Sequence, residues 1–511
     1  MLKIKKRMLT LSMGFAMMVA GSSAWAEMPK YVFFFLGDGM SSAQIQATEA
    51  YLTTINGGSA KLATDLMKPE NRLNMCKMPV QGMQTTYDAH ALMTDSASAG
   101  TAFACGIKTM SGVVGMDETM TIPYKSVAEL AFEKGKKVGV ISSVSLDHAT
   151  PASYYASVPN RGYMNKIATQ LTETGYDFFG GGGFASPTAP ARSGDTSNNI
   201  WSLLTDKGYS VINNRDAMMA LKKKPKDKVV CINPYLQDAA AMPYAIDRPN
   251  TNLSLKEMTE VAISCLKNGK RKHCGNDGFF LMVEGGKIDW ACHANDAMAT
   301  IGDTLDFDEA VGVAIDFYKK YPDQTLIVVT GDHETGGMTV GHATTGYSAY
   351  YDRILGQTNS FTYFGQKVWP SHKAAYGSGY NWSQSDNLAS NSAMINLMKS
   401  EFGLIWSELN AYQKEKLEDA YDKSMCGTNN NGSDENTLLY GGYEPIIVTI
   451  THILNENSSI GWTSYSHTGV PVPVFAMGSE SRRFAGFYDN TDIAKKLVKA
   501  MNIRATLPVK K

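Results

Sequence analysis

Four continuous apolar runs along the chain each end abruptly in small and polar residues. They are YVFFFLGDG from Tyr31, VGVISSVSLDHATP from Val138, FFLMVEGG from Phe279 and TLIVVTGDHETGG from Thr325. Unbroken apolar runs of this kind are typical of strands buried on both faces of a mostly parallel sheet. Segments with a helical pattern lie between them, among them YKSVAELAFEKGKK and DTLDFDEAVGVAIDFYKKY. The alternation predicts an α/β fold with a central, mostly parallel sheet flanked by helices.

The polar residues of these runs indicate where a site should form. Each run carries an aspartate, glutamate, threonine or histidine at its carboxyl end. In sheets of this kind, ligands bind outside the carboxyl ends of the strands. We therefore expect these side chains to meet at one edge of the sheet.

The pattern loosens between about 338 and 466 into sequence rich in tyrosine, asparagine, serine and glycine. A helical stretch near 390–422 interrupts this segment, and GTNNNGSDEN from Gly427 is expected to form an exposed loop within it. The aromatic content argues against a disordered linker. We predict one domain over 27–511 that carries a large insertion at 338–466, and we expect the insertion to cover the site or to form a subunit contact.

The first 26 residues have a basic start, an apolar middle and a small-residue ending at Ala24-Trp25-Ala26. This pattern predicts a secretory signal peptide over 1–26 with cleavage before Glu27. A membrane anchor, the alternative, would need about 20 apolar residues and no cleavage signature. We expect a soluble mature protein that is exported to the periplasm or the medium and has no membrane anchor.

The charge balance excludes some classes of partner. The formal net charge is −1 and the sequence pI is about 6.8. A general binder of nucleic acid or of membrane surfaces would carry a strong basic excess. A substrate must therefore be recognised by a local site.

Cysteine and glycine patterns add little chemistry. Seven cysteines are an odd number for an exported chain, so at least one stays unpaired or pairs between molecules. A local bridge between Cys265 and Cys274 is left open, because spacing does not fix connectivity. The glycine run at 180–183 lacks the Walker pattern and is expected to be a turn after a strand.

The stretch TDSASAGTAFACG from Thr94 places Ser96 where a helix should begin, beside Asp95. An ordinary helix cap explains a polar residue here, whether Thr94, Asp95 or Ser96 provides it. The alternative is a nucleophilic serine, although the glycine-flanked elbow of α/β-hydrolases is missing. The stretch alone favours the cap, and a nucleophile needs support from elsewhere in the chain.

Acids and histidines in four further segments provide candidate metal ligands. Asp289 and His293 are four residues apart and share one face if their segment is helical. Such a pair is two thirds of the protein ligands of a catalytic zinc site, and it needs a third from elsewhere. The other candidates lie in glycine-punctuated segments at predicted strand ends, namely Asp332, His333, His467 and Asp38.

Two hard oxygen ligands and one arginine complete the candidates. Glu284 ends the FFLMVEGG run and Thr150 lies in HATP. Carboxylate and hydroxyl oxygens of this sort favour magnesium over zinc. Arg161 offers a planar fork that matches two phosphate oxygens, although a lone arginine is more often a surface ion-pair residue.

The segments GDGM, TDSASAGTA, HATP with the following Arg161, VEGGKID with a histidine four residues on, TGDHETGG and SHTG occur together in this order. In order, spacing and strand context they resemble the alkaline phosphatase family, and the chain looks like a bacterial, exported member. The likeness extends from Asp38 to His467, essentially the whole mature chain. It implies that 27–511 is a catalytic domain and that the protein is a homodimer.

The resemblance also implies two Zn²⁺ and one Mg²⁺ per subunit. The implied ligands are Asp289, His293 and His467 for the first zinc, Asp38, Asp332 and His333 for the second, and Asp38, Thr150 and Glu284 for magnesium. It implies Ser96 as the nucleophile and Arg161 as the phosphate clamp, positioned in part by Asp95.

This arrangement would remove the need for a histidine base beside Ser96. A metal cation stabilises an alkoxide as it stabilises a bound hydroxide. The serine would attack a phosphate monoester in line, and a metal-activated water would hydrolyse the resulting phosphoserine. Small phosphate monoesters of broad range are the expected substrates, because the implied groups address only phosphate and metals.

Two positions depart from the pattern of some family members. His148 stands where those members have an acid, and Trp290 stands where they have a lysine. A histidine supports magnesium less well than a carboxylate does. The two departures bear on which metal fills the third site and on how tightly phosphate is held.

Two rival functions are weighed against monoester hydrolysis. A phosphodiesterase or sulfatase of the same superfamily is disfavoured, because Glu284, Thr150 and Arg161 serve a phosphate with several free charged oxygens. A metal- or phosphate-binding protein without catalysis is disfavoured by a nucleophile beside a complete ligand set.

Overall fold

The computed structural model describes residues 28–268 and 278–511. The predicted signal peptide over 1–26 lies outside these residues. Within them the main sheet is formed by strands β1 (Tyr31–Gly37), β2 (Val80–Gln84), β3 (Lys137–Ser142), β4 (Phe178–Gly181), β5 (Ser210–Ile212), β6 (Val229–Ile232), β7 (Phe279–Glu284), β8 (Thr325–Gly331), β13 (Val472–Gly478) and β14 (Gly486–Tyr488). Four short strands pair outside it: β9 (Glu334–Thr335), β10 (Thr339–Val340), β11 (Ile460–Gly461) and β12 (His467–Thr468).

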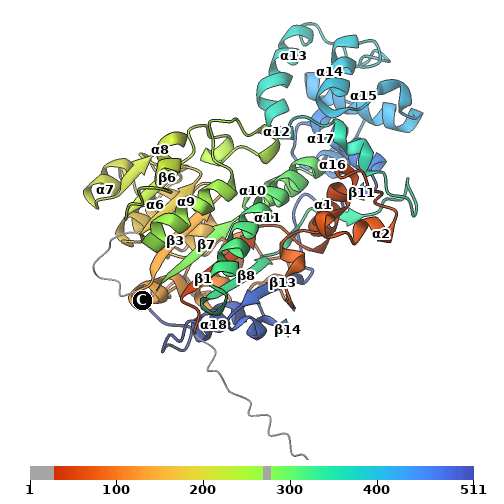
Figure 1. The fold of residues 1–511 in the computed structure, drawn as a ribbon. Helices are drawn as coiled ribbons and strands as arrows, with labels where there is room; N and C mark the ends of the chain where they lie inside the picture. The colour runs from red at the N-terminus through yellow and green to blue at the C-terminus, as the bar shows by residue number, and fades with distance from the viewer. Residues whose placement is uncertain (1–27, 269–277) are drawn as a thin grey trace, which may run out of the picture.

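The helices alternate with the strands over the first part of the chain and dominate 338–466 (Figure 1). They are α1 (Ser42–Ile55), α2 (Ala63–Leu66), α3 (Ser96–Cys105), α4 (Val127–Glu133), α5 (Ala149–Ala152), α6 (Met164–Glu173), α7 (Ile200–Asp206), α8 (Arg215–Ala220), α9 (Leu255–Asn268), α10 (Lys287–His293), α11 (Ala297–Lys320), α12 (Phe361–Tyr363), α13 (Trp369–Tyr376), α14 (Ser392–Phe402), α15 (Ala411–Cys426), α16 (Ser433–Tyr440), α17 (Pro445–Asn457) and α18 (Thr491–Ala500).

The main sheet has the strand order β14-β2-β13-β8-β1-β7-β3-β4-β6-β5. Its neighbours pair in parallel, except that β13 runs antiparallel to both β8 and β2. The predicted α/β fold with a mostly parallel sheet is confirmed. The four apolar runs form β8, β1, β7 and β3, which are consecutive in the sheet, so their carboxyl ends lie side by side.

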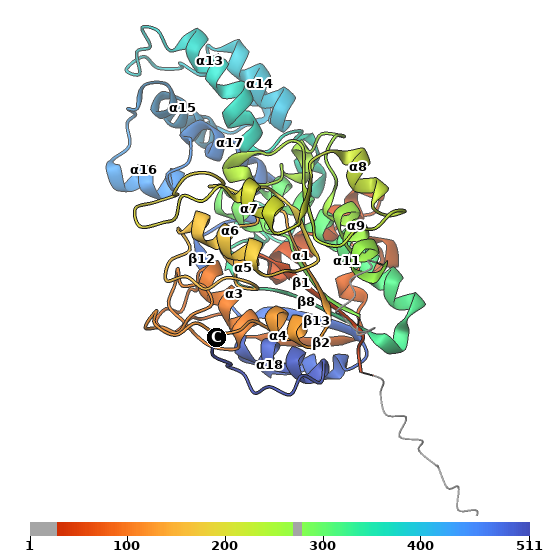
Figure 2. The same ribbon diagram turned by 90° about the vertical axis from the view of Figure 1, so that its left-hand side faces the viewer.

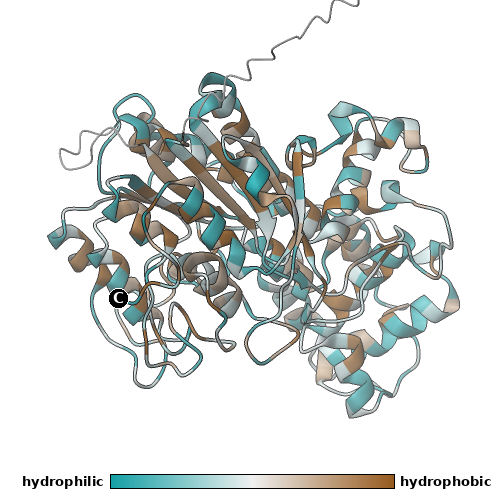
Figure 3. Ribbon diagram, turned by 90° about the horizontal axis from the view of Figure 1, so that it is seen from below, coloured by the Kyte–Doolittle hydropathy of each residue, from teal (hydrophilic) through white to brown (hydrophobic). Residues whose placement is uncertain are grey.

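Strand β1 shows why its sequence is an unbroken apolar run. Phe34 faces one core cluster, and its neighbours Phe33 and Phe35 face the cluster on the opposite side of the sheet. Helices α3, α4, α6 and α18 contribute to the first cluster, and α8, α9 and α11 contribute to the second. Figure 3 shows the apolar strands enclosed between helices whose outward faces are more polar.

The 338–466 segment folds mainly as helices α12 to α17 and builds a lobe beside the sheet (Figures 1 and 2). The predicted helical stretch near 390–422 corresponds to α14 and α15. Apolar residues of this lobe share one core cluster with α1 and α11, for example Phe402 and Ile450 with Ala47 and Ile301. The segment is therefore packed on the sheet domain through those two helices.

Two local predictions need correction. GTNNNGSDEN is not one exposed loop, because α16 begins at Ser433 with two acidic residues in its first turn, where the helix dipole favours them. In the glycine run, 180 and 181 are the last residues of β4, and only 182 and 183 follow the strand. A side chain at Gly181 would meet the Ser142 carbonyl oxygen at 1.8 Å, so close strand packing requires glycine there.

The described residues contain six free thiols, at Cys76, Cys105, Cys231, Cys265, Cys292 and Cys426. Cys274 lies outside the described residues, so the bridge to Cys265 stays a prediction. No helix within 28–268 or 278–511 is long and apolar enough to cross a bilayer.

Candidate active site

Neighbouring strands bring the predicted polar residues to one edge of the sheet. Asp38 directly follows β1, Glu284 is the last residue of β7, and Asp332 and His333 follow β8. Strand β3 leads through a short connection to α5, which carries Thr150. All five side chains are buried. The sheet thus collects them at its carboxyl edge, as the strand pattern predicts.

The first group of candidate ligands is Asp289, His293 and His467. Nε2 of His293 lies 3.1 Å from Nε2 of His467. Oδ2 of Asp289 lies 3.3 Å from Nε2 of His293, and Oδ1 of Asp289 lies 3.5 Å from Nε2 of His467. Each Nδ1 donates to a backbone carbonyl at 2.6 Å, His293 to Tyr465 and His467 to Thr94. The Nε2 atoms are left facing each other, and two nitrogen lone pairs at this distance repel unless a cation or a proton lies between them.

The second group is Asp38, Asp332 and His333. Nε2 of His333 lies 3.4 Å from a carboxylate oxygen of each aspartate. The other oxygen of Asp332 accepts the backbone N–H of Gly39 and of His333, each at 3.0 Å. These two bonds fix the carboxylate, so that its free oxygen points at the His333 ring.

Thr335 connects the first two groups. Its hydroxyl donates to Asp289 at 2.5 Å and lies 3.2 Å from Nδ1 of His333. Because the single hydroxyl proton is used on Asp289, the Thr335 oxygen accepts from Nδ1 of His333. His333 is therefore held with its Nε2 unprotonated and directed at Asp38 and Asp332.

The third group surrounds Asp38 and Glu284. Their carboxylate oxygens and a ring nitrogen of His148 lie within 4.8 Å of one another. The Thr150 hydroxyl donates to Asp38 at 3.3 Å, and the Ser142 hydroxyl donates to Glu284. The group is mainly oxygen, with His148 where a further carboxylate could stand.

Ser96 is the first residue of α3 and is buried. The helix cap is Asp95, whose carboxylate accepts the Ser98 N–H at 2.9 Å, so Ser96 is not needed for capping. The Thr94 carbonyl two residues earlier accepts the Nδ1–H of His467. The start of α3 is therefore joined directly to the first group of candidate ligands.

Arg161 lies between Asp95 and His148. Its Nη1 donates to Asp95 and its Nη2 to Nε2 of His148, each at 2.9 Å. Burial works against ionisation of Asp95, but the Arg161 charge and hydrogen bonds from Ser98 and Gly112 lower its pKa below the usual range. Burial and the Arg161 charge lower the pKa of His148 to about 3, so this ring is neutral. Trp290 packs edge-on against it, with ring centroids 5.9 Å apart.

The acids of the site repel one another. Burial, followed by the charges of Asp332, Asp289 and Glu284, raises the pKa of Asp38 well above its usual value. Burial also raises the pKa of Glu284 to about 8 and that of Asp332 to about 7. Ionising all of them together requires compensating positive charge.

His293 of the first group provides a small part of that charge. Burial disfavours the protonated form of His293, but the Asp289 carboxylate outweighs it and raises the pKa to about 9. Burial likewise opposes ionisation of Asp289, yet His293, His467 and His333 lower its pKa well below the usual range.

Unpaired buried atoms test whether metal ions fit this site. The buried side-chain atoms of the described residues that have no hydrogen-bond partner include one oxygen each of Asp38, Glu284 and Asp332, Nε2 of His333 and Nδ1 of His148. Leaving such groups unpaired is costly, and native interiors rarely do so. These atoms lie in the second and third groups and are carboxylate oxygens and imidazole nitrogens. These donors fit divalent cations.

Sequence reasoning overlooked several groups that shape the site. Thr335 lies two residues after His333 in TGDHETGG, so the sequence already places it close to a predicted ligand. Ser142 ends β3 at the level of Glu284 in the neighbouring strand, and only the strand register shows this. The carbonyls of Thr94 and Tyr465 have no sequence signature.

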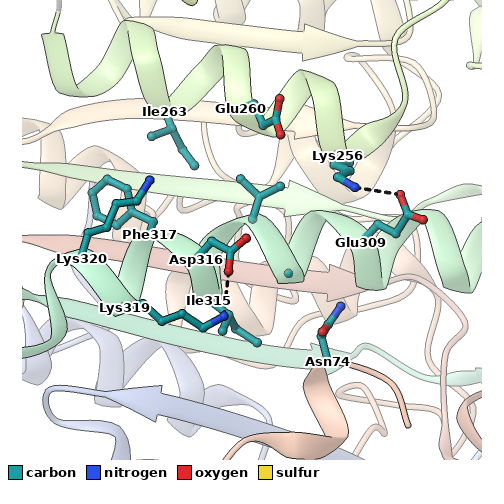
Figure 4. Close-up of a pocket in the computed structure, with 12 residues that line it drawn as sticks. Asn74, Lys256, Glu260, Ile263, Glu309, Ile315, Asp316, Phe317, Lys319 and Lys320 are labelled. Carbon is teal, nitrogen blue, oxygen red and sulfur yellow. Dashed lines mark hydrogen bonds and ion pairs between the residues drawn. The ribbon is translucent and has the colours of Figure 1, made fainter. Parts of the chain in front are cut away.

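A surface groove of about 500 Å³ between α9 and α11 lies elsewhere (Figure 4). Several of its charged side chains are in ion pairs, Lys256 with Glu309, Lys319 with Asp316, and Glu260 with Lys222 outside the groove. None of the candidate ligands lines it. It is a salt-bridged surface rather than a second site.

Comparisons with known proteins agree with the geometry. The family model described as alkaline phosphatase matches residues 29–503. Alkaline phosphatase 3 of Bacillus subtilis is 32% identical over 480 residues, which cover 92% of this chain and 89% of that protein. The repressible alkaline phosphatase of Saccharomyces cerevisiae is 27% identical over 501 residues, or 92% of this chain and 80% of that protein.

Solved structures give the same result. The alkaline phosphatase of Thermus thermophilus has a TM-score of 0.72 and 26% identity, covering 98% of this chain and 97% of that one. The cold-active enzyme of a psychrophilic Shewanella species has a TM-score of 0.68 and 25% identity, covering 92% and 99%. Three clusters of side chains could each hold a metal ion, namely Asp289 with His333 and His467, Asp38 with Asp332 and His333, and Asp38 with His148 and Glu284. Because the family model matches nearly the whole described chain, this chain belongs to the alkaline phosphatase family, whose members are metal-dependent enzymes that hydrolyse phosphate monoesters.

Proposed function

We propose that this enzyme hydrolyses small phosphate monoesters of broad range through a covalent phosphoserine on Ser96. The observation that carries the proposal is the hydrogen bond from His467 to the Thr94 carbonyl, which joins the start of α3 to the metal-binding groups. Ser96 is buried at the N-terminal end of a ten-residue helix. Backbone N–H groups at such an end favour an anionic phosphate.

We assign two Zn²⁺ and one Mg²⁺ per subunit to the three groups. Nitrogen with carboxylate oxygen suits zinc, and hard oxygen suits magnesium. The proposed ligands are Asp289, His293 and His467 for the first zinc, Asp38, Asp332 and His333 for the second, and Asp38, Thr150 and Glu284 for magnesium. When bound, these metals supply Lewis-acid stabilisation of the Ser96 alkoxide and of the leaving oxygen.

Ser96, Arg161 and a water molecule carry out the remaining steps. Ser96 attacks phosphorus in line, the ester bond to the alcohol breaks, and the alcohol departs. Arg161 binds the non-bridging oxygens with its planar fork, which Asp95 orients through the 2.9 Å ion pair. Water then attacks the phosphoserine from the opposite side, which releases inorganic phosphate and restores Ser96.

We also propose that the protein is exported and assembles as a homodimer. The basic, apolar and small-residue pattern of residues 1–26 supports a signal peptide and export to the periplasm or medium. Family membership supports a homodimer, with the 338–466 segment as a candidate for the rim of the site or the subunit contact. N-terminal sequencing of the exported protein should begin at Glu27, and sedimentation equilibrium should give twice the chain mass. An uncleaved N-terminus or a monomer would contradict these points.

Replacing the nucleophile tests the chemistry directly. Ser96→Ala should reduce kcat at least about a thousandfold, because it removes the group that forms the covalent intermediate. Zinc and magnesium content should stay at the wild-type level, since Ser96 is not among the assigned ligands. Acid quenching of the wild-type enzyme during turnover of labelled substrate should trap phosphate on Ser96, and label on any other residue would refute the assignment.

The buried acids should make the free energy of unfolding of the metal-free protein depend on pH. The pKa of Glu284 is raised to about 8 by burial, whereas that of an unfolded glutamate is about 4.3. The unfolded chain therefore ionises first, and stability is lost as pH rises from about 4.3 to about 8. The free energy of unfolding of the metal-free protein is measured in urea. The value for Glu284→Gln minus the value for wild type should be larger at about pH 8.5 than at about pH 5. An equal difference at both pH values would argue against this cause.

The third metal site should respond to charge at His148. His148→Asp adds a carboxylate beside Asp38 and Glu284 and should tighten magnesium by about tenfold in a titration of activity against free magnesium. His342→Asp is the matched control, because it adds the same charge at a half-buried loop position in the lobe. Unchanged magnesium dependence in His148→Asp would contradict the assigned site.

A further inference from the structure

The two histidines of the first group come from distant parts of the chain. His293 ends α10, and His467 begins β12 after a loop over 462–466. Their Nε2 atoms nevertheless lie 3.1 Å apart. Something must hold the two segments in register, and the chain between them runs through α11, β8, β9 and then the 338–466 segment.

Asn295 joins the two segments. Its side chain is buried, and its backbone has the left-handed φ of +52° that asparagine tolerates better than most residues. Nδ2 donates to the Cys292 carbonyl at 2.8 Å and to the Ser464 carbonyl at 3.0 Å. Cys292 directly precedes His293, and Ser464 directly precedes Tyr465. The Tyr465 carbonyl in turn accepts the Nδ1–H of His293.

Two residues of helix α17 (Pro445–Asn457) form hydrogen bonds with Asn295. Because the amide nitrogen of Asn295 faces two carbonyls, its Oδ1 must accept, and it does so from Nε2 of His452 at 2.9 Å. Asn455, one turn further along α17, donates to the Asn295 carbonyl at 2.7 Å. Burial lowers the pKa of His452 to about 4, so its ring stays neutral and the donated proton is retained.

His452 also packs against the loop that leads to His467. Its ring lies nearly parallel to the Tyr465 ring, with centroids 5.9 Å apart and an angle of 29°. Helix α17 therefore contacts the His293 side through Asn295 and the His467 side through Tyr465.

We infer that α17 is a positioning element of the first zinc site, with His452 and Asn455 fixing Asn295 so that His293 and His467 keep the spacing one metal ion needs. The inference rests on the proposed assignment of His293 and His467 as ligands of that zinc. It gives part of the 338–466 segment a role beyond covering the site or meeting a partner subunit. Groups that orient metal ligands commonly contribute tenfold or more to affinity.

The test compares His452→Phe with His452→Gln in the full enzyme. Phenylalanine keeps the ring but removes the donor, and glutamine keeps a nitrogen donor at similar reach. Zinc affinity is measured by chelator competition, with His293→Ala marking which binding step belongs to the first site. His452→Phe should weaken that step about tenfold, and His452→Gln should restore most of the loss.

The control is His372→Phe. His372 lies in α13 of the same lobe, and its Nε2 lies 2.9 Å from the Tyr421 hydroxyl. Its ring packs with Trp369, Tyr376 and Tyr421 instead of with Asn295 or Tyr465. This variant should leave both zinc steps unchanged. Thermal unfolding of the metal-free variants separates a general loss of packing from a loss of zinc affinity.

Wild-type zinc affinity in His452→Phe, with only the metal-free melting temperature lowered, would overturn the inference. If that variant does not fold, Asn295→Gly takes its place, because glycine accepts the positive φ and removes the amide. Asn295→Gly should weaken the same zinc step, and unchanged affinity would again overturn the inference. If His293→Ala itself leaves both zinc steps intact, the proposed ligand set has failed instead.

Discussion

Asp38, Glu284, Asp289 and Asp332 are four carboxylates buried together at the carboxyl edge of the sheet. At about 4 Å, and with an effective dielectric constant of about 20, two like charges repel by about 4 kcal/mol. Backbone N–H groups, hydroxyls and histidines offset part of this, yet several carboxylate oxygens have no partner among the described residues. The fold can bury this cluster in its ionised form only with cations present, so metal binding and stability are coupled in this enzyme.

The strands supply the rigidity that such a cluster needs. β8, β1 and β7 are adjacent and hold their terminal acids in fixed register. Asp95 links this edge to the proposed phosphate site, because it caps α3, pairs with Arg161 and accepts the Gly112 N–H at 3.0 Å. The start of α3, the arginine and the metal-binding groups are therefore parts of one hydrogen-bonded unit rather than separate features.

The sequence predicts the parts of this structure that depend on residue type and on the local spacing of apolar and polar residues. β1 and its neighbours are buried on both faces, so each is an unbroken apolar run. Asp289 and His293 meet because α10 is a helix. By contrast, α16 was missed because its sequence is polar and it depends on an acidic first turn and the packing of Tyr440. The hydrogen bonds of Asn295 to residues 169 and 157 positions away leave no local signature.

The most direct test of the metal-dependent serine mechanism is the initial rate of hydrolysis of a simple aryl phosphate monoester by chelator-stripped mature protein. The rate is measured before and after zinc and magnesium are added back, with metal content determined for each sample. The account predicts no turnover when the protein is stripped and recovery when the metals return. Turnover that survives complete stripping, or that stays absent after confirmed metal uptake, would contradict it.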